Sequence, residues 1–134
     1  MIEFDWKLRV RYGETDRMGY VYYGNYAEYF EVARVEMLRA AGVSYRDLED
    51  KGILLPVLEY SVKYFQPVYY DEEITITISM QELPGVRIVF DYETKNESGT
   101  VVNKAQTTLV FVDRKSGKPV KCPADVYEAF ENWR

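Results

Sequence analysis

The sequence predicts an α+β protein in which one long helix packs against an antiparallel sheet. Three observations predict this class: one segment of helical periodicity near the N-terminus, one strand-like segment before it, and about four strand-like segments after it. The helix carries one wide apolar stripe, and the strands carry one apolar face. A sheet that wraps around the helix buries both surfaces at once.

The first strand is expected at about Phe4–Tyr12, where apolar and basic residues alternate. Alternation with a period of two is typical of a strand that buries one face. The apolar face holds Trp6, Leu8, Val10 and Tyr12.

The long helix is expected at about Asn25–Ala41. Apolar residues recur there at spacings of three and four, as in an amphipathic helix: Tyr26, Phe30, Ala33, Met37 and Ala41. Asn25 is a suitable N-cap and Gly42 a suitable stop. Arg34 and Glu36 lie outside the stripe and are expected to form a solvated or interfacial pair.

The remaining elements follow in order. Ser44 is expected to cap a short helix at Tyr45–Lys51 that Gly52 ends. Long strands are then predicted at Ile53–Phe65, Ile74–Met80, Val86–Tyr92 and Val101–Val112, and a short helix after Pro123. The last three of these strands are separated by short turns, which predicts an antiparallel meander.

Composition limits the classes of function. The 134 residues are expected to form one domain over 1–134, and they include no histidine and one cysteine, Cys122. Without histidine, the usual Ser-His-Asp triad and histidine-ligated zinc are excluded. The net charge of −5 disfavours nucleic acid as a partner. The acidic N-terminus and the lack of a long apolar run predict a cytoplasmic protein without a membrane anchor.

The most informative segment is the loop before the long helix, which reads Y-G-E-T-D-R-M-G-Y-V-Y-Y-G-N-Y over Tyr12–Tyr26. Its carboxylate, Asp16, precedes the helix N-terminus, where free N–H groups can stabilise developing negative charge. In a chain without histidine, such a carboxylate is a natural candidate for acid–base or nucleophilic chemistry. The many aromatic residues nearby indicate an aromatic-lined pocket or an aromatic interface between subunits.

This segment, continuing into E-Y-F-E-V-A-R, resembles the hotdog-fold acyl-CoA thioesterases of the 4-hydroxybenzoyl-CoA thioesterase family. The resemblance covers about Trp6–Val126, and the segment L-E-Y-S-V-K-Y-F-Q-P-V-Y-Y-D-E-E-I supports it. It implies a five-stranded antiparallel sheet wrapped around a central long helix. It also implies a homodimer or homotetramer, with the active sites at the interface of sheets paired edge to edge.

The resemblance assigns catalytic roles to two positions. Asp16 would act as a nucleophile on the thioester carbonyl or as a general base on water, and the sequence leaves both open. The backbone N–H of Tyr23 would polarise the thioester oxygen. Some branches of the family carry histidine at the position of Tyr20 or Tyr23, so a mechanism that needs histidine cannot be transferred here.

Further positions are candidates for substrate binding. Gly19 would let the loop turn beside the carboxylate. The Tyr20 side chain would either pack at the subunit interface or donate a hydrogen bond from its hydroxyl to the thioester carbonyl or to water. Asn25 is a cap or a substrate contact, and Glu59 is a second carboxylate near the thioester or a surface residue. Candidate cations for the phosphates of coenzyme A are Lys63, Arg87, Lys118 and Lys121.

The predicted function is hydrolysis of an acyl-CoA thioester to a free acid and coenzyme A, without metal or cofactor. The alternative is a non-catalytic module that binds an acyl thioester or an acyl carrier protein. A hotdog-fold dehydratase is disfavoured because its chemistry uses a histidine base. The acyl chain, the donor (coenzyme A or acyl carrier protein) and the choice between dimer and tetramer stay open.

Overall fold

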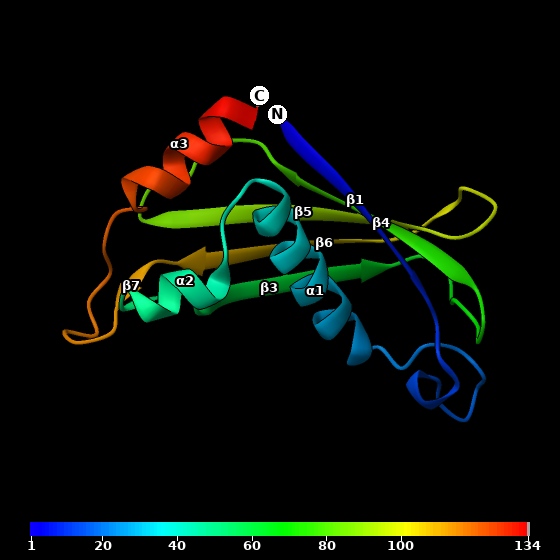
Figure 1. The fold of residues 1–134 in the computed structure, drawn as a ribbon. Coiled ribbons are helices and arrows are strands. Elements are labelled where there is room, and N and C mark those ends of the chain that lie inside the picture. The colour runs from blue at the N-terminus through cyan, green and yellow to red at the C-terminus, as the bar shows by residue number, and fades with distance from the viewer. Residues whose placement is uncertain (134) are drawn as a thin grey trace.

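Five antiparallel strands form the main sheet of the computed structural model, which describes residues 1–133, and a helix of 16 residues lies against one face (Figure 1). In chain order the elements are β1 (Ile2–Arg9), a 3-10 turn (Tyr12–Glu14), α1 (Asn25–Ala40), α2 (Tyr45–Asp50), β2 (Ile53–Leu54), β3 (Val57–Tyr64), β4 (Glu73–Met80), β5 (Arg87–Lys95), β6 (Val101–Val110), β7 (Val112–Asp113) and α3 (Ala124–Trp133). The sheet order is β1-β4-β5-β6-β3.

The predicted meander is confirmed, because β4, β5 and β6 are consecutive antiparallel neighbours. The register places Ile78 opposite Phe4 on one side and Tyr92 on the other. β3 precedes β4 in the chain but lies at the far edge beside β6. The two edges of the sheet are therefore β1 and β3.

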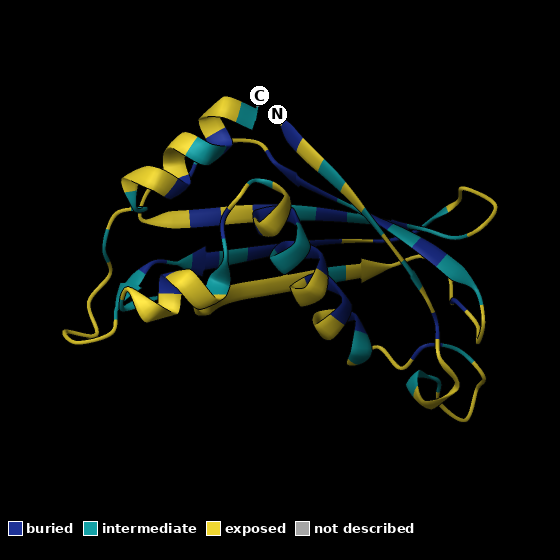
Figure 2. Ribbon diagram, in the orientation of Figure 1, coloured by how far each residue is buried: buried dark blue, intermediate teal, exposed yellow. Residues whose placement is uncertain are grey.

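The core lies between α1 and the inner face of the sheet, where the buried parts of both gather (Figure 2). Phe30, Ala33 and Met37 of α1 are fully buried, as are Ile76 and Ile78 of β4. Burying each large apolar side chain stabilises the fold by about 1.5–3 kcal/mol. The predicted stripe is thus confirmed from Tyr26 to Met37, whereas Ala41 is half-buried and lies just past the end of the helix.

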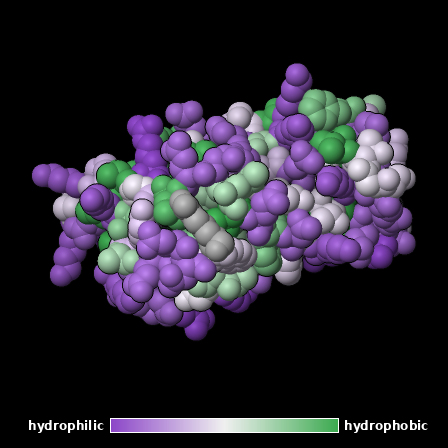
Figure 3. Space-filling view, turned by 90° about the horizontal axis from the view of Figure 1, so that it is seen from above, coloured by the Kyte–Doolittle hydropathy of each residue, from purple (hydrophilic) through white to green (hydrophobic). Residues whose placement is uncertain are grey.

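The helix α3 covers the end of the sheet where the two chain ends lie close together (Figure 1). Val126 and Phe130 are buried there, and the Trp133 ring meets Phe4 edge-on, with 6.2 Å between the ring centroids. The surface on this side of the molecule is mainly hydrophilic, with small separate apolar areas (Figure 3).

Besides β5, which continues to Lys95 and not to Tyr92, three predicted strands differ from the structure. The segment Ile53–Phe65 divides into β2 and β3 around Pro56, and β2 pairs with β7 in a separate two-stranded sheet. The segment Val101–Val112 divides at Phe111, whose N–H donates to Val86 and whose carbonyl accepts from Val120. The first strand ends at Arg9, and Tyr12 begins the 3-10 turn. In each case the alternation of apolar and polar residues continues past the residue at which the backbone hydrogen bonds to the neighbouring strand end or pass to another partner.

The prediction that Asn25 caps the long helix is wrong. The cap position is Gly24, which has no side chain to accept a bond, and Asn25 is the first helical residue. Its Nδ2 instead donates to the Glu14 carbonyl at 2.8 Å. The other boundary predictions hold, since Gly42 ends α1 with φ of +89° and Ser44 accepts from the Asp47 N–H at the start of α2.

The predicted pairing of Arg34 with Glu36 is also wrong. Arg34 is buried, with 5% of its surface exposed, and its Nη1 donates to the Tyr92 hydroxyl at 3.0 Å. The Tyr92 and Thr107 hydroxyl oxygens lie 2.6 Å apart, which continues the chain of contacts into β6. Glu36 instead pairs with Arg39. Because residue 34 is four positions after Phe30 and three before Met37, it lies on the buried stripe itself.

The central position of Phe30 in the core gives a stability prediction. We expect Phe30→Ala to lower the free energy of unfolding by about 3–5 kcal/mol, because it leaves a cavity under α1. Val32→Ala is the matched control on the exposed side of the same helix and should change it by less than about 0.5 kcal/mol. Urea denaturation followed by circular dichroism measures both. Equal effects of the two changes would contradict this account of the core.

Candidate active site

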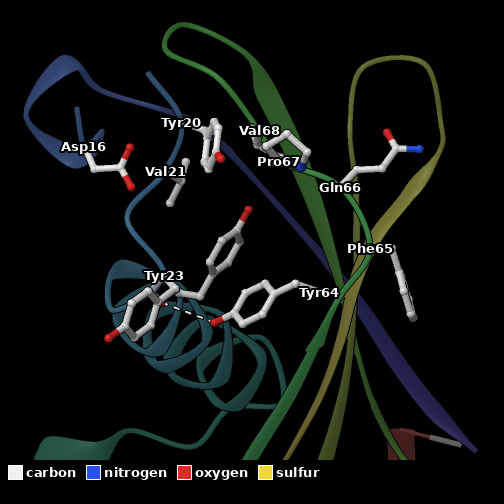
Figure 4. Close-up of a pocket in the computed structure, with 10 residues that line it drawn as sticks. Asp16, Tyr20, Val21, Tyr23, Tyr64, Phe65, Gln66, Pro67 and Val68 are labelled. Atoms are coloured by element: carbon white, nitrogen blue, oxygen red, sulfur yellow. Dashed lines mark hydrogen bonds between the residues drawn. The ribbon is translucent and has the colours of Figure 1, made fainter. Parts of the chain in front are cut away.

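A pocket of about 280 Å³ lies beside the N-terminal end of α1 (Figure 4). Two segments far apart in the sequence form it: the loop that enters α1, and the end of β3 with the loop that follows. The lining residues are Asp16, Tyr20, Val21, Tyr23, Tyr26, Tyr64, Phe65, Gln66, Pro67 and Val68. The two segments are joined by the Val21 N–H, which donates to the Val68 carbonyl at 2.8 Å.

Asp16 lies in a tight turn that is closed by its own backbone. Its N–H donates to the Tyr20 carbonyl at 2.9 Å, and its carbonyl accepts from Gly19 at 3.0 Å. Gly19 has φ of +88°, a conformation that glycine adopts without strain and that supports its predicted turn role. Asp16 Oδ1 accepts from the Met18 N–H at 2.9 Å, whereas Oδ2 accepts no bond from residues 1–133. Figure 4 shows the carboxylate on the side of the loop that faces Val21 and Tyr20.

The entry to α1 has two N–H groups without an acceptor in the described chain, and one of them belongs to Tyr23, which lines the pocket together with Asp16. The first hydrogen bonds of the helix entry run from Asn25 to the Tyr22 carbonyl and from Tyr26 to the Tyr23 carbonyl. Within the described chain, the N–H groups of Tyr23 and Gly24 donate to no acceptor. Such groups at a helix N-terminus carry partial positive charge and favour an anion. The Tyr23 carbonyl also accepts from the Tyr64 hydroxyl at 3.4 Å, which connects the loop to β3 (Figure 4).

Glu14 fastens the loop to the helix. Its Oε1 accepts from the Arg11 N–H at 2.8 Å and from the Tyr29 hydroxyl at 2.9 Å. Its carbonyl accepts from the Tyr22 N–H at 2.9 Å and from Asn25 Nδ2 at 2.8 Å. Burial alone would raise the pKa of Glu14, but the bonds from Arg11 and Tyr29 outweigh it and hold that pKa below its ordinary value.

The structure brings three of the predicted site residues, Asp16, Tyr20 and Tyr23, to one pocket. The Tyr20 ring meets Tyr69 edge-on with 5.8 Å between the ring centroids, and its hydroxyl donates to Met18 Sδ at 3.1 Å. Gly19 shapes the turn, and the Asn25 side chain binds the loop at the Glu14 carbonyl. Neither of these two residues lines the pocket.

The other predicted contacts lie elsewhere in this chain. Glu59 and Lys63 alternate along β3 with Tyr60 and Tyr64, whose rings contact α1, so the two charged side chains lie on the opposite face of the sheet. Arg87 begins β5 beside a separate hollow that contains Gln81 and Asp91. Substrate contacts by these three residues stay a prediction, since they do not line this pocket.

Sequence reasoning missed two features of the site. The wall at Gln66–Val68 had no predicted role, although its residues were part of the supporting motif. The fastening role of Glu14 was also missed. A glutamate three residues after Arg11 in a loop that enters a helix was the available signal, because such a side chain can accept backbone N–H bonds.

Two further observations on residues 1–133 concern metal binding and membrane insertion. In this range no group of three or more histidine, cysteine, aspartate or glutamate side chains is arranged to hold a metal ion. None of the helices described there combines the length and apolar character needed to cross a membrane.

Known proteins resemble this chain over most of its length. The family model of the thioesterase-like superfamily matches residues 10–130. The acyl-CoA thioester hydrolase YbgC of Escherichia coli O157:H7 is 31% identical over 128 residues, covering 96% of each chain. The 1,4-dihydroxy-2-naphthoyl-CoA hydrolase of Thermosynechococcus vestitus is 30% identical over 104 residues, covering 77% of this chain and 71% of its own.

A solved structure agrees in both fold and sequence. The DHNA-CoA thioesterase from Staphylococcus aureus superposes with a TM-score of 0.92 at 34% identity, covering 98% of this chain and 91% of its own. The mixed α+β architecture therefore matches that of a thioesterase. Together with the family match over 10–130, this places the chain in the thioesterase-like superfamily.

Proposed function

We propose that this chain hydrolyses acyl-CoA thioesters to a free acid and coenzyme A at the pocket beside α1. One observation carries the proposal: a carboxylate with a free oxygen, Asp16, lines the same pocket as Tyr23, whose N–H has no acceptor within residues 1–133. The activities named for the relatives support the same reaction.

The chemistry needs few groups. The thioester oxygen would accept from the Tyr23 N–H, which stabilises the negative charge that develops on that oxygen in the transition state. Asp16 would either attack the carbonyl carbon or take a proton from an attacking water. The carbon–sulfur bond then breaks, and the sulfur leaves as a thiolate. If water is the attacking group, the free acid forms in this step. If Asp16 is the attacking group, the acyl chain is held as a mixed anhydride with Asp16, and a water then hydrolyses that anhydride to release the acid and restore the carboxylate. Since a simple thiol has a pKa of about 8.5, this leaving group does not depend on a histidine acid.

The proposed assembly is a homodimer through β3, with a homotetramer as the larger form. This edge strand is exposed on both faces, and Leu58, Tyr60 and Tyr64 keep 50%, 42% and 45% of their surfaces exposed. A free edge with apolar side chains invites pairing with another strand. A second copy of β3 would extend the sheet next to Tyr64 and Phe65, which line the pocket.

This assembly has consequences for the rest of the chain. Glu59, Lys63 and Arg87 would meet substrate only from a neighbouring copy or on the outer face of the sheet. Residues 1–134 would act as one domain whose sheet wraps around α1 as the central helix. One cysteine, Cys122, is compatible with a reducing compartment such as the cytoplasm.

We expect Asp16→Asn to lower kcat by about 10²–10⁴, the usual contribution of a positioned acid–base group. The asparagine oxygen can still accept from the Met18 N–H, so the turn should persist. Release of coenzyme A from a panel of short, long and aromatic acyl-CoA substrates, followed with a thiol reagent, measures the effect.

Asp50→Asn, an exposed change at the end of α2, is the control and should retain full activity. Hydrolysis by Asp16→Asn at the rate of the control would refute the role of Asp16. A wild-type protein that binds acyl-CoA but releases no thiol from any substrate would favour the non-catalytic binding module instead.

We expect the wild-type protein to elute in light-scattering chromatography at twice its chain mass of 15.8 kDa, or at a multiple of that dimer. Leu58→Lys should shift it toward the single chain, because a charge on each copy would be buried in the paired edges. Val89→Lys, on the exposed face of the central strand β5, is the matched control and should leave the dimer intact. A wild-type monomer with full activity would overturn the shared site.

A further inference from the structure

Buried polar atoms without partners cluster at one place in this chain. Of the four such side-chain atoms in residues 1–133, three belong to Thr94 and Asn103. Both residues are fully buried on the inner face of the sheet. Buried polar atoms in folded proteins nearly always have a hydrogen-bond partner, so three orphans at one position require an explanation.

The register of the sheet places this cluster next to the pocket. Asn103 of β6 lies directly opposite Thr94 of β5 on one side and Tyr64 of β3 on the other. Side chains that are opposite in an antiparallel pair have Cβ atoms about 4.5–5.5 Å apart. Tyr64 lines the pocket, so Asn103 lies one strand further into the sheet than this part of the pocket wall.

A second pocket residue, Tyr26 of α1, is buried against the same part of the sheet. The Tyr26 and Tyr64 rings are in contact, with 5.6 Å between the ring centroids. Two contacting rings that line the pocket therefore adjoin the cluster, because Tyr64 lies opposite Asn103 in the sheet.

The cluster is costly for the fold. An unsatisfied amide in the core is destabilising, whereas an apolar side chain of similar shape would pack against neighbours such as Ile76, which lies opposite Thr94 on β4. Polar groups that weaken a core are commonly kept at functional sites. Asn103 offers a donor and an acceptor, and Thr94 offers a hydroxyl, a combination that suits a group able to donate and accept at once.

We propose that Asn103 and Thr94 form a polar floor that binds a hydrogen-bonding group at the far end of the acyl chain. The chain then selects acyl thioesters with a distal hydroxyl over those ending in plain hydrocarbon. Tyr64 is the movable cover, because 45% of its surface is exposed and its hydroxyl makes one long hydrogen bond within residues 1–133, at 3.4 Å to the Tyr23 carbonyl. This selectivity rests on the proposed thioesterase function.

The test compares substrates that differ only at the far end. The first pair is ω-hydroxyhexanoyl-CoA and heptanoyl-CoA, in which a methyl group replaces the hydroxyl. The second pair carries a ring: 4-hydroxyphenylacetyl-CoA and 4-methylphenylacetyl-CoA. For the wild-type protein we expect kcat/KM to favour the hydroxylated member of at least one pair by about tenfold or more, since a site built to bond a hydroxyl rejects its apolar analogue.

Variants of the polar floor test whether Asn103 and Thr94 cause the preference for the hydroxylated substrate. Asn103→Leu and Thr94→Val should each bring the ratio toward one while the methyl substrate is still hydrolysed. Thr75→Val, on the opposite face of β4, is the control and should leave the ratio unchanged. Asn103→Leu should also keep or raise the midpoint of thermal unfolding, a result not expected of a residue that is needed for packing.

Several outcomes would overturn the floor. The proposal is wrong if the wild-type kcat/KM ratio of hydroxylated to methyl substrate is near one in both pairs. If Asn103→Leu then also lowers the midpoint of thermal unfolding, a permanently bound water is the partner of the buried polar atoms. The proposal is also wrong if both variants keep the wild-type preference for the hydroxylated substrate. If Asn103→Leu fails to fold, Thr94→Val and the wild-type ratio decide. Absence of hydrolysis with every substrate would overturn the proposed function itself, whereas hydrolysis without preference would overturn only the floor.

Discussion

The attachment of the loop to α1 through Glu14 is the constraint on which the candidate site depends. The loop has no helix or strand of its own beyond one 3-10 turn, and its residues are mostly exposed. The Glu14 carboxylate and carbonyl together accept bonds from Arg11, Tyr22, Asn25 and Tyr29. These bonds fix the loop against the first turn of the helix, so that Asp16 and Tyr23, whose N–H has no acceptor within residues 1–133, line one pocket. In the proposed reaction, this arrangement would give a chain without histidine both a nucleophile or base, Asp16, and a donor to the thioester oxygen, the Tyr23 N–H.

The second constraint is the edge position of β3. In the main sheet this strand has one hydrogen-bonded neighbour, β6, and its side chains are exposed on both faces. Its end supplies Tyr64 to the pocket wall, next to Phe65 and Gln66. The exposed edge strand therefore leads directly into the loop that, together with Tyr64, forms half of the pocket lining. The same strand would therefore form the subunit interface and end at the pocket, so pairing of two copies would place each pocket at the interface.

The spacing of residues along the chain correctly predicted those elements that depend on neighbouring residues alone. The α1 stripe, the meander and the Ser44 cap follow from spacing, and the motif around Asp16 pointed to the carboxylate that lines the pocket. The errors arose where a distant partner decides the outcome. Asn25 bonds a loop carbonyl 11 residues earlier, and Arg34 bonds a hydroxyl 58 residues later. The pocket wall at Gln66–Val68 likewise lies far from the Asp16 loop in the sequence, and the two segments come together only when the sheet has folded.

The buried tyrosines have a consequence for the pH range in which the fold persists. Burial raises the pKa of Tyr92 to about 12, and it also raises the pKa values of Tyr26 and Tyr29. In the unfolded chain these phenols would ionise near pH 10. Above that pH the unfolded state binds fewer protons than the native state, so stability falls as the solution becomes more alkaline. No imidazole titrates near neutrality in this chain, and its tyrosine-rich interior makes strong base a characteristic denaturant.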